Sequence, residues 1–198
     1  MRNKFLGDSL DMSKRAAICL LREAGFSLCI CPLPSEEDFS EAIYRSCLGL
    51  EEGDRVFNPT ERFRGNQREN HVIALRKELS EWKPKNTGVA ILDPDKGVHD
   101  SERRCQYVTV GEVNGLTDVG AGHIIAVYHH RNAGRILPTD LVGRFSARSA
   151  VAYDFGAAVL CFVHTEMTNL QRIREVFITK LNRERILPKQ MARLGGLT

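Results

Sequence analysis

A short apolar run in the middle of the chain leads into residues that could do chemistry. Residues 89–92 form the run, and after it come Asp93, Pro94, Asp95, Lys96 and Gly97. Such a run predicts a buried strand, and loops at the carboxyl edge of an open α/β sheet aim side chains into a crevice. Two carboxylates there can bind a metal ion, activate water or stabilise a cationic transition state. The same residues also form ordinary turns, because proline presets φ and glycine accepts positive φ, so a purely structural interpretation stays open.

Two later predicted strands also end in polar residues. The apolar run 123–128 is followed by His129, His130 and Arg131, and the run 157–163 by His164, Thr165 and Glu166. If all these strands are parallel, their polar ends lie along one edge of the sheet. Neighbouring side chains of a strand point to opposite faces, so His129 and His130 share a role only if the strand has already ended. The candidate catalytic residues are therefore Asp93, Asp95, His130 and His129.

A third group of polar residues precedes the first predicted helix. Asp8, Asp11 and Lys14 follow Gly7 at short intervals. The two acids could cap the start of the helix, which is the more common role of such residues. Alternatively the segment forms a cradle over the sheet edge, in which Lys14 binds a phosphate.

Strand and helix patterns alternate along the whole sequence. This alternation predicts a single α/β domain over residues 1–198, with a mostly parallel sheet and helices on both faces. The expected strands are near-continuous apolar runs, as in sheets that are covered on both faces. The expected helices span about 11–24, 35–49, 67–82, 138–150 and 169–185, and the expected strands about 26–31, 89–92, 123–128 and 157–163.

Composition excludes several classes of protein. The chain has 198 residues and a net charge of +3, and no apolar run approaches the roughly 20 residues of a membrane span. The N-terminus becomes acidic before a signal-peptide core develops, so we expect a cytoplasmic protein with no membrane partner. The six cysteines lack metal-type spacing and are expected to be reduced. The chain has no phosphate-binding P-loop and no glycine-rich dinucleotide fingerprint.

Basic residues suggest a nucleic-acid partner. Arg62 and Arg64 flank Phe63, an arrangement in which an aromatic ring can wedge between or stack on bases while the arginines contact phosphates. Arg131 begins a second basic group after the histidines, and the C-terminal segment holds a third. Such residues supply the sequence-independent part of DNA binding. They could equally form a solvated, soluble surface.

Three motifs together resemble an uncharacterised bacterial protein family. They are Gly-Asp-x-x-Asp-x-x-Lys near the N-terminus, Leu-Asp-Pro-Asp-x-Gly after a strand, and Tyr-x-His one strand later. The resemblance covers roughly the first two thirds of the chain, but the family implies no known reaction. The matching residues are Gly7, Asp8, Asp11, Lys14, Leu92, Asp93, Pro94, Asp95, Gly97, Tyr128 and His130.

The layout is also similar, more weakly, to the uracil-DNA glycosylase superfamily. Those enzymes have a doubly wound α/β fold, a strand that enters an Asp-Pro or Asn-Pro loop, and a later strand that ends in histidine. Asp93-Pro94 and His129-His130 stand in comparable places. The glycine expected before Asp93 is absent, and no Pro-Ser follows the histidines.

Three functions compete on this basis. In an N-glycosylase acting on flipped-out bases, Asp93 orients water and stabilises the sugar cation, while His130 or His129 stabilises the departing base, and no cofactor is needed. In a nuclease or phosphohydrolase, Asp93 and Asp95 with Asp8 or Glu166 would hold Mg²⁺. A non-catalytic nucleic-acid-binding protein needs only the basic surface. We rank them in that order, with DNA as the partner, phage defence as one conceivable setting, and the oligomeric state left open. The expected substrate-binding residues are Asp8, Asp11, Lys14, Arg62, Phe63, Arg64, Tyr128 and Arg131.

Overall fold

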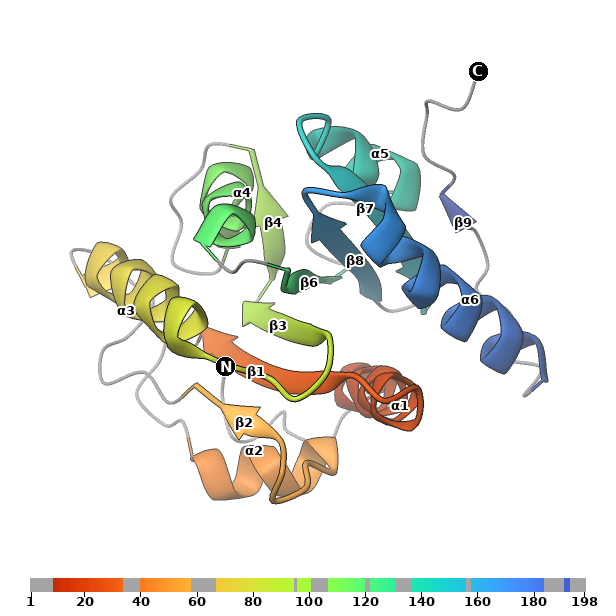
Figure 1. Cartoon of the computed structure of the whole chain (residues 1–198), viewed down its shortest axis with the longest axis horizontal. Helices are drawn as coiled ribbons and strands as arrows, with labels where there is room; N and C mark the ends of the chain where they lie inside the picture. Colours follow the sequence, from red (N-terminus) through yellow and green to blue (C-terminus); the bar gives the residue numbers. More distant parts are fainter. Residues whose placement is uncertain are drawn as a thin grey trace.

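A seven-stranded β-sheet forms the centre of the protein, with helices on both of its faces (Figure 1). The computed structural model describes residues 9–33, 40–57, 67–94, 96–100, 107–119, 122–130, 137–155, 158–183 and 191–192. The strands lie side by side in the order β2-β1-β3-β6-β8-β7-β9. Their bounds are β1 (Ser27–Leu33), β2 (Arg55–Val56), β3 (Gly88–Pro94), β6 (Ile124–His130), β7 (Ser149–Asp154), β8 (Ala158–His164) and β9 (Met191–Ala192).

Most of the sheet is parallel. Strand β1 pairs in parallel with β2 and β3, and β3 pairs in parallel with β6. Strand β8 is antiparallel to both β6 and β7, so β7 runs in the same direction as β6. Strand β9 is antiparallel to β7. A separate parallel pair, β4 (Gly97–His99) and β5 (Tyr107–Thr109), lies beside the main sheet.

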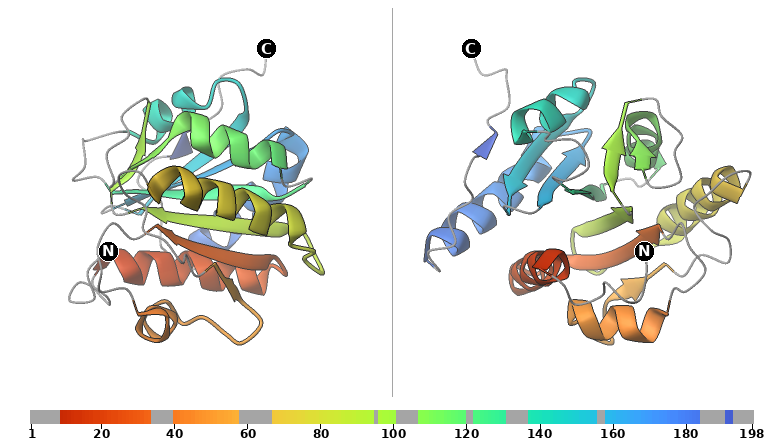
Figure 2. Two further views of the ribbon diagram at one scale, coloured as in Figure 1. Left: turned by 90° about the vertical axis from the view of Figure 1, so that its left-hand side faces the viewer. Right: turned by 180° about the vertical axis from the view of Figure 1, so that it is seen from behind.

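The helices divide between the two faces of the sheet (Figure 2). Helices α1 (Ser9–Glu23), α2 (Glu41–Leu48) and α6 (Met167–Arg183) pack on one face. Helices α3 (Gln67–Glu81), α4 (Val110–Val119) and α5 (Pro138–Arg144) pack on the other. Because both faces are covered, β3 and β8 are buried along their whole length. This arrangement confirms the predicted α/β class with a mostly parallel sheet between two helical layers.

The segment 138–155 differs from the expectation. A helix was predicted to about Ala150, but α5 ends at Arg144 and β7 begins at Ser149. The short connection from β7 to β8 makes these two strands an antiparallel pair, since a parallel pair would need a long crossover. Strand β8 therefore runs against β6, and His164 pairs with Ser149 at the start of β7. The expectation that His164 and Glu166 share an edge with Asp93 is wrong for this reason.

Two further properties of the described residues bear on the expectations. None of their helices combines the length and the apolar character that a membrane crossing requires. Their cysteines, Cys19, Cys29, Cys31, Cys47 and Cys161, are free thiols.

Candidate functional site

The connections of β1 and β3 create a topological switch point at the carboxyl edge of the sheet. From β1 the chain moves outward to β2, and it then crosses back to β3 on the other side of β1. In doubly wound sheets ligands bind where such connections diverge, outside the carboxyl ends of the strands. Pro32 pairs with Asp93, and Leu33 with Pro94, at this point. Asp93 therefore stands at the switch point of the sheet.

Side chains from two helices contact the Asp93 carboxylate. Lys14 of α1 places its Nζ 2.8 Å from Oδ1 and donates a hydrogen bond of 3.0 Å to Oδ2. The hydroxyl of Tyr44 in α2 donates a second hydrogen bond of 2.7 Å to Oδ2. Asp93 is only 1% exposed. A buried carboxylate needs such partners, because burying an unpaired charge is costly.

Lys14 also contacts a second carboxylate. Its Nζ lies 3.2 Å from Oδ1 of Asp11, three residues earlier on the same helix. Burial alone would lower the pKa of Lys14, but the carboxylates of Asp93 and Asp11 raise it above the ordinary value. Lys14 is therefore a charged, buried ammonium that holds Asp93. In this conformation it is not the phosphate-binding lysine that the sequence suggested as one alternative.

Tyr128 completes the group from β6. Its neighbour Val127 pairs with Leu92, so Tyr128 lies beside Asp93 on the same face of the sheet. The Lys14 ammonium is 5.6 Å from the centre of the Tyr128 ring. The Tyr128 hydroxyl is buried and has no hydrogen-bond partner in the part of the chain that the structure describes. Burial, followed by the nearby Asp93 and Asp11, raises the pKa of Tyr128 well above its usual value.

These five residues form one group, which we call the Asp93 cluster: Asp11, Lys14, Tyr44, Asp93 and Tyr128. Four of them were candidates from the sequence: Asp93 as a catalytic residue, and Asp11, Lys14 and Tyr128 as substrate-binding residues. Tyr44 was missed. Its spacing of four residues from the apolar Leu48 was the available signal that it faces the sheet.

His129 lies on the opposite face of β6 from the Asp93 cluster. The backbone N–H of Val98 donates a hydrogen bond of 3.1 Å to its Nδ1, which assigns the ring proton to Nε2 when the histidine is neutral. Gly97 can lie against this ring because glycine has no Cβ. A Cβ at that position would lie only 2.5 Å from Nδ1. Burial, together with the charges of Arg144, His130 and His99, lowers the pKa of His129 to about 4.

His130 follows on the same face as Tyr128. Its backbone N–H donates a hydrogen bond of 2.9 Å to the carbonyl of Lys96, and its side chain is half-buried. Alternation along β6 thus separates the two histidines, as the sequence indicated. Only His130 shares a face with Asp93.

We expect His129 to make the protein less stable in acid. Its pKa in the folded state lies below the ordinary 6.5, so between pH 6.5 and about 4 the unfolded chain binds a proton that the folded chain does not. Stability should therefore fall as pH decreases through this window, by up to about 3 kcal/mol. His129→Asn keeps an acceptor for Val98 and removes the titration. Urea unfolding at pH 7 and 4.5 should show a smaller loss in the variant. Equal losses in the two proteins would contradict this account.

Several candidates from the sequence lie outside the described residues, namely Asp8, Asp95, Arg62, Phe63, Arg64 and Arg131. Some arginines of the expected basic surface are described, and they are engaged within the protein. Arg148 pairs with Asp118, Arg144 with Asp100, and Arg172 donates to the carbonyl of Ala24.

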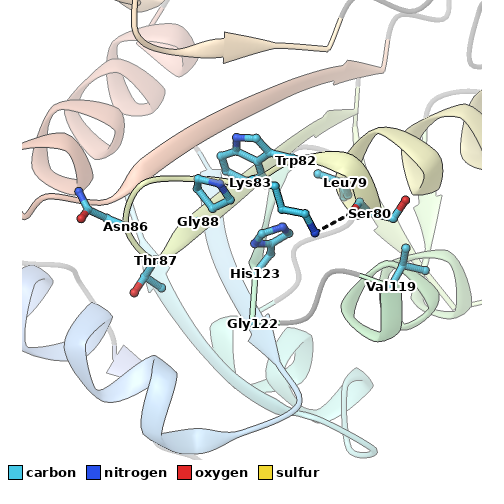
Figure 3. Close-up of a pocket in the computed structure, with 11 residues that line it drawn as sticks. Leu79, Ser80, Trp82, Lys83, Asn86, Thr87, Gly88, Val119, Gly122 and His123 are labelled. Atoms are coloured by element: carbon cyan, nitrogen blue, oxygen red, sulfur yellow. Dashed lines mark hydrogen bonds between the residues drawn. The ribbon is translucent and has the colours of Figure 1, made fainter.

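A cavity of about 410 Å³ lies at the other end of the sheet, away from Asp93 (Figure 3). The C-terminal end of α3 and the starts of β3 and β6 line it, and the rings of Trp82 and His123 pack 4.8 Å apart. Burial lowers the pKa of His123, although contacts with the backbone of Trp82 and Leu79 oppose this effect. In the described part of the chain, no group of three or more histidine, cysteine or acidic side chains is placed to hold a metal ion.

Comparison with known proteins gives no match: no protein-family model, no curated protein and no solved structure is significantly similar to this chain.

Proposed function

We propose that the chain is a hydrolase that acts on DNA and cleaves the N-glycosidic bond of a target base. One observation carries the proposal: a buried, hydrogen-bonded carboxylate, Asp93, stands at the switch point of a doubly wound sheet. The carboxyl edge at such a point is where this fold class binds its ligands. Cleavage of an N-glycosidic bond develops positive charge on the sugar. A fixed carboxylate in a site of low dielectric constant stabilises such charge.

The contacts of Asp93 fix its side chain, which suits an electrostatic role. Oδ2 accepts hydrogen bonds from Lys14 and Tyr44, while Oδ1 lies 2.8 Å from the Lys14 Nζ but accepts no hydrogen bond from the described residues. Lys14 and Tyr44 therefore hold the Asp93 side chain in a fixed position. In this scheme His130, on the same face as Asp93, is the histidine best placed to contact the departing base.

The same contacts bear on the Mg²⁺ alternative. A magnesium ion that bound Asp93 would compete with an ammonium group 2.8 Å away. The like charges of Mg²⁺ and Lys14 would repel each other across a buried site. The same repulsion acts on a developing sugar cation, but that cation carries at most one charge spread over several atoms, so it is repelled less than Mg²⁺. We therefore propose the glycosylase scheme without a metal cofactor.

A strand-cleavage assay separates these two chemistries. Natural and base-modified DNA duplexes are incubated with the protein in EDTA or in Mg²⁺, and half of each sample is then treated with alkali. We expect strand breaks only after alkali, and equally in EDTA, because loss of a base leaves an intact backbone. Direct breaks that EDTA abolishes would contradict the proposal and would favour a metal-dependent nuclease.

A further inference from the structure

His129 and Arg144 bond to the backbone N–H and the backbone carbonyl of a single residue of β4. The backbone N–H of Val98 donates to Nδ1 of His129 at 3.1 Å. The carbonyl of Val98 accepts a hydrogen bond of 3.2 Å from Nη1 of Arg144. Gly97, with φ +129°, lets this strand approach His129 closely. Strand β4 therefore fixes the two side chains relative to each other, and we call them the His129–Arg144 pair.

Both side chains retain donors that no described residue accepts. Because Nδ1 of His129 accepts a hydrogen bond, the ring proton lies on Nε2, which is buried and has no partner among the described residues. A buried donor without a partner is rare and calls for an explanation. Arg144 engages Nη1 with Val98 and Nε with Asp100, 3.4 Å away. Its Nη2 has no contact among the described residues.

We infer that the His129–Arg144 pair binds a phosphodiester group of the nucleic-acid substrate. A guanidinium and a neutral N–H donor together can satisfy the oxygens of one phosphate. The pair lies at the carboxyl end of β6, on the face opposite Asp93, so the bound anion avoids the Asp93 carboxylate. His129 has no exposed surface, so groups that cover it must shift when the phosphate enters. This inference takes from the proposed function only that the substrate is a nucleic acid.

The test follows the histidine ring resonances by NMR while inorganic phosphate, and separately the dinucleotide d(TpT), is added to the whole protein. An anion beside Nε2 favours the charged ring, so the pKa of His129 should rise by about one unit or more from its value of about 4. The charged or titratable groups that face His129 are Arg144 of α5, His99 of β4 and its neighbour His130. His123 and His164, at the other end of the sheet, are internal controls and should not respond.

Two arginine variants complete the test. Arg144→Gln should weaken the response to d(TpT) about tenfold, whereas Arg148→Gln, which removes an arginine paired with Asp118, should leave it unchanged. Arg144→Lys retains a cation and should restore part of the binding if the glutamine variant unfolds. The inference is overturned if His129 responds no more than His123 and His164, if Arg144→Gln and Arg148→Gln behave alike, or if only inorganic phosphate binds. None of these results depends on base release, so they test this inference independently of the proposed reaction.

Discussion

Replacing Asp93 by asparagine is expected to lower the free energy of unfolding by about 3–5 kcal/mol, the cost of breaking a buried ion pair. The substitution leaves the Lys14 ammonium, which is 3% exposed, without its partner on β3. It also replaces the charged acceptor of the Tyr44 hydroxyl. Lys14→Met should cost a similar amount, because it leaves the Asp93 carboxylate buried without its counter-ion. Urea unfolding at pH 7 measures both values.

The double variant tests whether the two single substitutions break the same interaction, the ion pair between Asp93 and Lys14. Asp93→Asn combined with Lys14→Met should cost much less than the sum of the single variants, because neither position then carries a charge. Asp11 loses its contact with Lys14 in Lys14→Met and in the double variant alike, so this loss does not enter the coupling. The exposed pair Arg148–Asp118 is the control, and a cycle there should give a coupling below about 1 kcal/mol. Additive effects of the two substitutions at Asp93 and Lys14 would show that the pair is not the link that joins α1 to β3.

The central strands could be predicted from the sequence because their cores are continuous apolar runs. Residues 26–31, 89–92, 123–128 and 157–163 all fall in or next to the observed β1, β3, β6 and β8. Burial on both faces requires apolar side chains at every position, and this signal needs no knowledge of the partners. The strand ends were placed less well, since hydrogen-bond pairing extends β6 to His130, through residues that look polar.

The direction of β8 could not be predicted once β7 was missed. Residues 138–150 contain no proline or glycine break after Gly143, and alanine and arginine favour a helix there. The pairing of β7 with β8 overrides that local preference. Without β7, a helix was expected to precede β8, and a helical crossover makes a strand parallel. Because β7 was missed, the sequence analysis placed His164 at the wrong edge of the sheet.

Helix faces were harder to predict than helix positions. In α2 the apolar Ile43 is 45% exposed, and Tyr44 is the side chain that faces the sheet. Tyr44 is buried because its hydroxyl has a carboxylate to bond, and that partner lies 49 positions further along the chain. A local pattern cannot contain a contact of this kind. In the same way Lys14 was recognised as a functional candidate, while its actual partner, Asp93, emerged only from the fold.

The Asp93 cluster connects stability and function through the same carboxylate. Lys14 and Tyr44 hold the Asp93 side chain in a fixed position, which is what the proposed electrostatic stabilisation of a sugar cation requires. A variant that loses activity only because it unfolds would not test this role. A control variant must therefore break another buried ion pair without touching the site. The pair of Arg68 with Glu112 serves this purpose, since it packs on the other face of the sheet.

The most direct test of the account is the rate of base release by Asp93→Asn, measured in single turnover with excess protein on a DNA that the wild type cleaves after alkali. The temperature is kept below the unfolding transition, and Glu112→Gln is measured in parallel. We predict that Asp93→Asn slows release about 100-fold or more, as expected for loss of a fixed stabilising group, while Glu112→Gln stays within a few fold of the wild type. A wild-type rate in folded Asp93→Asn, or equal losses in the two variants, would show that Asp93 serves only to hold the fold together.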